Sequence, residues 1–108
     1  MKLVGFYGNI FVLDFKGVIL LPEICRFEGI IIKLLFLDND RHHKPHVHIY
    51  YGDYEASVAM DGELLSGSLP IKKFRLVQAW LILHEDELYE MWNMAIKGLP
   101  FGKIKPLN

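Results

Sequence analysis

The chain has 108 residues, which is the length of one small domain. Apolar residues make up 52% of it and charged residues 23%, a composition that excludes an intrinsically disordered protein. The formal net charge of -1 provides no overall positive field, so any nucleic-acid binding must come from a local basic patch. Cys25 is the single cysteine, which excludes an internal disulfide and favours a reducing, cytoplasmic location.

The first 21 residues are apolar, but they do not predict a membrane span. The uncharged run 3–13 is much shorter than the roughly 20 residues that a transmembrane helix requires. A secretory signal peptide is not expected, because no alanine precedes Ala56 and an A-x-A cleavage site is therefore missing. The apolar segments separated by turn residues predict short strands at 3–7, 10–15 and 18–21.

A second apolar segment follows Pro22. Residues 29–37 are almost continuously apolar, and Lys33 is the one charge among them. Such a run predicts a strand inside a sheet that is covered on both faces. A polar loop at 38–44 is expected after it.

The clearest local prediction is a hairpin formed by 46–51 and 54–60. Gly52-Asp53 is a two-residue loop with glycine at its first central position. This loop places Val47 opposite Val58 and gives the hairpin one wholly apolar face. The other face then carries His46, His48 and Tyr50 opposite Ala59, Ser57 and Glu55. A second turn at 61–62 leads to a short strand at 63–66.

Two helices are expected in the last third of the chain. Pro70 suits a first helical position, and the apolar spacing predicts helices on both sides of a break near His84. Glu85–Glu87 belong in the first turn of the second helix, and its end is predicted at Gly98. The tail 101–107 is expected to form a short edge strand. The fold class is therefore α+β, an antiparallel sheet of about four to five strands with two C-terminal helices on one face.

Four of the five histidines lie between positions 42 and 48. Side chains two residues apart on a strand point the same way, about 6–7 Å apart. His46 and His48 can therefore converge on one ion or one substrate group.

Three interpretations of these histidines remain open. They can be structural residues of a sheet face. They can hold a divalent transition metal through His46 and His48, with His42, Asp53 or Glu55 as a further ligand. They can also carry metal-free acid–base chemistry, as cleavage of RNA at a 2′-hydroxyl requires. The candidate catalytic residues are His42, His46, His48, Tyr50 and Glu55.

Basic residues suggest a patch that binds an anion or a partner protein, although an ordinary solvated surface would have the same composition. The candidate patch consists of Arg41, Lys44, Lys72, Lys73 and Arg75. Trp80 and Trp92 lie on apolar helix stripes and are expected in the core. Cys25 is expected to be a buried, unreactive thiol.

Several motifs between residues 22 and 107 are typical of a known protein family. They are PEICRFEGIIIK, HHKPHVHIYYGDYEA, GELLSGSLP, LVQAWLILHEDELYEMW and GKIKPL. In these motifs the chain resembles DUF4160, a small bacterial family of domains of unknown function. The residues that match its signature are His42, Pro45, His46 and His48, with Trp80, His84 and Trp92 as helical landmarks. Lys44 departs from the family's usual double proline.

Residues 1–21 have no counterpart in the family pattern, which normally begins where this chain has Leu21-Pro22. We therefore expect a single α+β domain at 22–108. The strand-like extension at 1–21 is expected to be an addition upstream of an ancestral start.

The resemblance implies a toxin-like component of a bacterial two-gene toxin–antitoxin module, neutralised by a small cognate antitoxin-like protein. Combined with the histidines, it predicts a cytoplasmic protein that cleaves RNA or another phosphate ester. One alternative is a non-enzymatic antitoxin or adaptor that docks a partner through an open sheet edge. Another is a metal-binding protein that uses the H-x-H strand. Exposed sheet edges also favour a homodimer.

Overall fold

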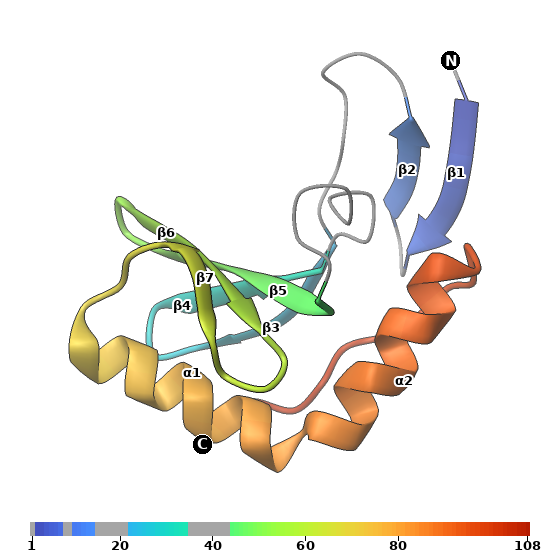
Figure 1. Ribbon diagram of the computed structural model, residues 1–108. Coiled ribbons are helices and arrows are strands. Elements are labelled where there is room, and N and C mark those ends of the chain that lie inside the picture. The colour runs from blue at the N-terminus through green and yellow to red at the C-terminus, as the bar shows by residue number, and fades with distance from the viewer. Residues whose placement is uncertain (1, 8–9, 15–21, 35–43) are drawn as a thin grey trace.

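The computed structural model describes residues 2–7, 10–14, 22–34 and 44–108, and it has the expected α+β fold (Figure 1). Five antiparallel strands follow one another in a sheet in the order β3-β4-β5-β6-β7. They are β3 (Glu23–Phe27), β4 (Ile30–Lys33), β5 (His46–Tyr51), β6 (Tyr54–Ala59) and β7 (Leu64–Gly67). The helices are α1 (Ile71–Leu83) and α2 (Glu85–Ile96). A separate two-stranded sheet is formed by β1 (Lys2–Tyr7) and β2 (Ile10–Asp14).

The β5–β6 hairpin has the predicted register. Val47 is opposite Val58, and Tyr51 is opposite Tyr54 across the two-residue loop. Gly52 has a φ of 56°, the positive value that this turn requires at its first central position. Val47 and Val58 are fully buried, so the apolar face of the hairpin forms part of the core.

The sheet begins one strand earlier than the sequence analysis assigned. β3 pairs with β4 through a tight turn in which Glu28 and Gly29 have φ values of 52° and 75°. β4 lies inside the sheet, as expected, but the prediction that both of its faces are covered is wrong. Its burial alternates: Ile30 and Ile32 are fully buried, whereas Ile31 and Lys33 are only half-buried.

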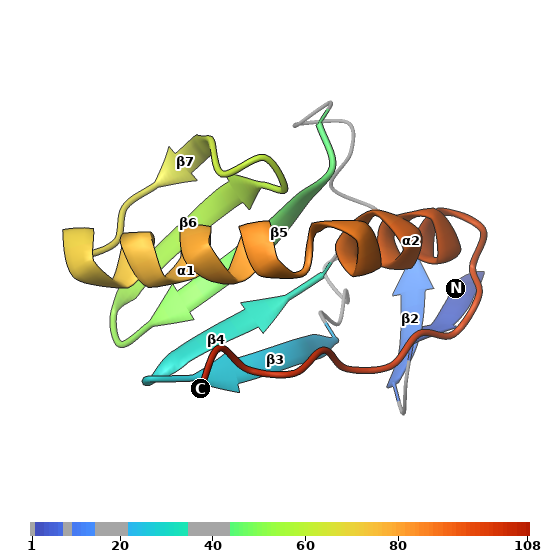
Figure 2. The ribbon, with the colours of Figure 1, turned by 90° about the horizontal axis from the view of Figure 1, so that it is seen from below.

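α1 lies across one face of the sheet, and α2 continues from it past the ends of the strands (Figure 2). Pro70 caps α1 rather than occupying its first helical position, and His84 lies at the predicted break between the helices. The acidic first turn of α2 is confirmed. Trp80, Trp92 and Cys25 are buried, as expected.

The C-terminal tail is not the predicted edge strand. Pro100 and Pro106 lack the N–H groups that a strand ladder needs, and no strand is assigned between them. The tail still lies beside β3, because the backbone N–H of Ile104 donates to the carbonyl oxygen of Ile24 at 2.9 Å. Phe101 and Ile104 are buried, and Trp80 Nε1–H donates to the carbonyl oxygen of Lys105.

Some expectations fall on residues outside the described part of the chain. These are the strand at 18–21, the end of the apolar run at 35–37, and Arg41, His42 and His43. Within the described ranges, no helix combines the length and the apolar character needed to cross a membrane.

Candidate functional site

The candidate site lies on the face of the sheet that points away from α1. We call this face the outer face. Directly opposite residues of antiparallel strands point to the same side of a sheet. His48 on β5 is opposite Lys33 on β4 and Ser57 on β6, and Ser57 is in turn opposite Ser66 on β7. The register therefore builds a polar row across four strands, with His48 near its centre.

His46 and His48 lie side by side, as their spacing predicted. Their ring centroids are 5.2 Å apart, and the ring planes meet at 62°. The His46 side chain is fully buried, and its ring lies 5.4 Å from that of Trp92 on α2. His48 is half-buried, with Nδ1 3.5 Å from the hydroxyl oxygen of Ser57. His48 is therefore the more accessible member of the pair.

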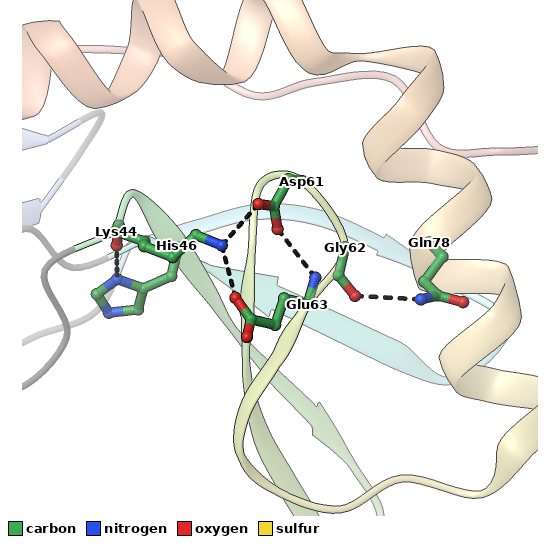
Figure 3. A network of polar contacts seen from close by, with 6 residues as sticks. All are labelled: Lys44, His46, Asp61, Gly62, Glu63 and Gln78. Carbon is green, nitrogen blue, oxygen red and sulfur yellow. Dashed lines mark hydrogen bonds and ion pairs between the residues drawn. The ribbon is translucent and has the colours of Figure 1, made fainter.

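A hydrogen bond selects the tautomer of the His46 ring. His46 Nδ1 lies 2.8 Å from the carbonyl oxygen of Lys44 (Figure 3). A carbonyl oxygen can only accept, so Nδ1 must carry a proton. In the neutral ring the lone pair then resides on Nε2. This is the arrangement in which an imidazole acts as a base or as a metal ligand.

Lys44 also joins the start of β5 to the turn between β6 and β7. Its Nζ donates to Asp61 Oδ2 at 2.6 Å and to Glu63 Oε1 at 2.5 Å (Figure 3). These hydrogen bonds raise the pKa of Lys44 well above its usual value. The bond from Lys44 lowers the pKa of Asp61 below its usual value. Lys44, Asp61 and Glu63 are called the Lys44 clamp below.

The predicted basic patch is not brought together around the histidines. Lys44 lies next to His46 at one end of β5. Lys73 is associated with the other end, where it donates to the carbonyl oxygen of Glu28 and its Nζ lies 4.9 Å from the Tyr51 ring. His46 and Tyr51 are five residue steps apart on β5, a distance of about 17 Å. Lys72 and Arg75 are exposed on α1 near Lys73, and Arg41 lies outside the described residues.

Lys33 is a site residue that the sequence analysis did not identify. It is opposite His48, and its Nζ lies 5.2 Å from the ring centroid of Tyr50. Tyr50 is itself opposite Glu55, so both of these candidates lie on the outer face. Lys33 is the one charge in an apolar strand, which was a usable signal. Its position beside His48 depends on the β4–β5 register, which the local sequence does not determine.

Of the candidate metal ligands, the structure brings only His46 and His48 together among the residues that it describes. Among the residues that the structure describes, no group of three histidine, cysteine or acidic side chains could hold a metal ion. Asp53 is in the turn at the far end of β5, and His42 lies outside the described ranges. Binding of a divalent transition metal by His46 and His48 stays a prediction, which elemental analysis of the purified protein tests.

A further histidine lies at the junction of α1 and α2. His84 is buried, and its Nδ1–H donates to Glu87 Oε1 at 2.7 Å. Its Nε2 is buried and has no hydrogen-bond partner among the described residues. A hollow of about 270 Å³ adjoins it, lined by Ile82–Glu87. The ring of His84 packs on Trp80, which indicates a role in joining the helices to the core.

Comparison with known proteins gives one match. The model of a family described as "Domain of unknown function (DUF4160)" matches residues 29–93. No curated protein and no solved structure matches the chain significantly. The matched segment runs from the start of β4 into α2 and includes the outer-face residues, the Lys44 clamp and His84. Because this segment covers more than half of the chain, the protein belongs to the DUF4160 family.

Proposed function

We propose that this chain is the toxin-like component of a bacterial two-gene toxin–antitoxin module. It acts in the cytoplasm on RNA or another phosphate ester, and a small cognate protein neutralises it. The toxin role rests on the family resemblance. The observation that supports the proposed chemistry is the pair of imidazole rings 5.2 Å apart, one with Nδ1 hydrogen-bonded to a carbonyl oxygen. Paired imidazoles can exchange protons near neutral pH without a metal.

The residues of the outer face have different roles in the proposed reaction. The contact with the substrate is assigned to His48, because part of its side chain is exposed whereas His46 is fully buried. The exposed part does not include Nε2, which is buried. Lys33 lies opposite His48 and supplies the positive charge that a phosphate group and its transition state require. Tyr50 and Glu55 form the next cross-strand pair on the same face and provide a second group for proton transfer. His46 lies beside His48 and orients it.

The second candidate is a non-enzymatic protein-binding module, an antitoxin or an adaptor. Complete burial of the His46 ring against Trp92 favours this function, because it is the environment of a structural histidine. β7 is the last strand of the five-stranded sheet, and Leu64 on it is 43% exposed. An edge strand of this kind can add a strand from a cognate protein, or from a second copy of the chain.

Expression in a bacterial host without the cognate protein tests the first candidate. The wild type should slow growth and degrade cellular RNA, whereas His48→Ala and Lys33→Ala should restore growth at equal protein levels. Lys105→Ala is the matched control, since Lys105 is an exposed lysine of the C-terminal tail that belongs neither to the outer face nor to the candidate basic patch, and it should remain toxic. Equal growth of the wild type and His48→Ala would contradict the catalytic proposal.

Co-purification separates the two candidates. A one-to-one complex with the product of the neighbouring gene, without any effect of the wild type on growth, would support the binding module. The mass of the complex also distinguishes a cognate partner from a homodimer.

A further inference from the structure

Lys44 contacts two parts of the molecule at once. Its side chain donates to Asp61 and Glu63 on the β6–β7 turn, and its carbonyl oxygen accepts the proton of His46 Nδ1 (Figure 3). The turn is itself held in place: Glu63 N–H donates to Asp61 Oδ1, and Gln78 Nε2–H of α1 donates to the carbonyl oxygen of Gly62. The Lys44 clamp thus connects α1, through the turn, to the residue that fixes the His46 ring.

We propose that the Lys44 clamp positions His46 by holding the Lys44 carbonyl oxygen against Nδ1. The clamp keeps the proton on Nδ1 and the lone pair on Nε2. Lys44, Asp61 and Glu63 are therefore positioning residues for the histidine pair. The role of that pair in chemistry rests on the proposed function, whereas the effect of the clamp on the His46 ring does not.

The exposure of the clamp argues against a role in stability alone. The side chains of Lys44, Asp61 and Glu63 are 45%, 47% and 59% exposed. Ion pairs between exposed side chains contribute little to folding stability. Lys44 lies two residues before His46, and its carbonyl oxygen contacts the His46 ring. The clamp can therefore affect the orientation of that ring.

The neighbouring backbone shows why the Lys44 side chain is needed. Met60 N–H donates to the carbonyl oxygen of Pro45, so the chain is already anchored one residue after Lys44. Pro45 also disfavours helical geometry at Lys44 and biases it toward extended conformations. Within that range, the contacts of the Lys44 side chain with Asp61 and Glu63 restrict the position of the residue. Removing the side chain should therefore release the carbonyl without unfolding β5.

Nitrogen-15 NMR of the His46 ring tests the proposal, because the chemical shifts of Nδ1 and Nε2 report which nitrogen carries the proton. The wild type should show the Nδ1–H form. Lys44→Ala should change the ratio of the two tautomers about fivefold toward Nε2–H, as the loss of one ordinary hydrogen bond implies. Lys44→Arg should restore the Nδ1–H form, because a guanidinium can reach both carboxylates.

Two further variants complete the test. Lys73→Ala removes a lysine that also donates to a backbone carbonyl, but at the far end of β5, and it should leave the His46 shifts unchanged. Asp61→Asn/Glu63→Gln keeps Lys44 but removes both charges of its partners, and it should reproduce Lys44→Ala. The proposal is overturned if both clamp variants are folded, as shown by their amide spectra, and keep the wild-type His46 shifts. If the clamp variants shift the His46 tautomer as expected but the wild type has no effect on growth, only the proposed function is contradicted.

Discussion

Gly67 shows how strongly one residue constrains the sheet edge. Its φ is 78°, and a Cβ there would overlap the carbonyl oxygen of Glu55 on β6. Both the backbone conformation and the close approach of β6 therefore require glycine. Gly67→Ala should lower the free energy of unfolding by about 2 kcal/mol or more, measured by urea denaturation.

Gly102→Ala is the control for this prediction. A Cβ at Gly102 would meet no atom within 4 Å, so the change should be within about 0.5 kcal/mol. Similar losses in the two variants would contradict the steric argument for Gly67.

The candidate site was predictable from the sequence only where the period of a single strand determines it. His46 and His48 were expected to share a face, and their rings are neighbours. The contact of Lys44 with Asp61 was not predictable, because it joins residues 17 positions apart. It also depends on the irregular pairing of β6 with β7 after Ser57.

At the scale of elements, the strands that could be predicted are those whose turns have a clear sequence signal. The β5–β6 hairpin followed from Gly52-Asp53 and from the apolar face that only one register produces. The sequence does not predict β3, because the segment is short and contains Glu23 and Arg26. Its pairing with β4 is also irregular after Glu23. Its partner and its tight turn become visible only in the folded sheet.

The β6–β7 turn gives a prediction on pH dependence. The hydrogen bond from Lys44 lowers the pKa of Asp61 in the folded state below the ordinary value of 3.8. The contribution of this bond to stability is therefore complete above the unfolded pKa and is lost as the pH falls through the lower folded pKa. The coupling between Lys44 and Asp61 should be present at about pH 6 and shrink toward about pH 2.5.

A double-mutant cycle measures this coupling. The wild type, Lys44→Ala, Asp61→Asn and the double variant are unfolded with urea at both pH values, and the interaction energy is the departure from additivity. The cycle cancels the acid response of the carboxylates that contact neither Lys44 nor Asp61. A coupling energy that is the same at both pH values would show that Asp61 does not titrate against Lys44.

At the scale of the whole molecule, the C-terminal tail connects the sheet to the helices. The tail runs beside β3 (Figure 2). Ile104 N–H donates to the carbonyl oxygen of Ile24 on β3, and the carbonyl oxygen of Lys105 accepts from Trp80 Nε1–H of α1. The tail thus closes the core at the side of β3, although its sequence gives no regular period. Such a segment cannot be predicted locally, because its conformation is set by elements about 25 and 80 residues away in the sequence.

This arrangement predicts that the tail stabilises the entire domain. Ile104 is 4% exposed and belongs to the core, so Ile104→Ala should lower the free energy of unfolding by about 2–4 kcal/mol. Leu99→Ala removes a side chain of similar size that is 47% exposed, and it should cost less than about 1 kcal/mol. Tryptophan fluorescence reports on Trp80 beneath the tail and on Trp92 of α2. Fluorescence and circular dichroism should give coincident urea transitions for Ile104→Ala, as one cooperative unit requires. A loss no larger than that of Leu99→Ala, or an early fluorescence change with the helices intact, would mean that the tail is an independent attachment rather than part of the core.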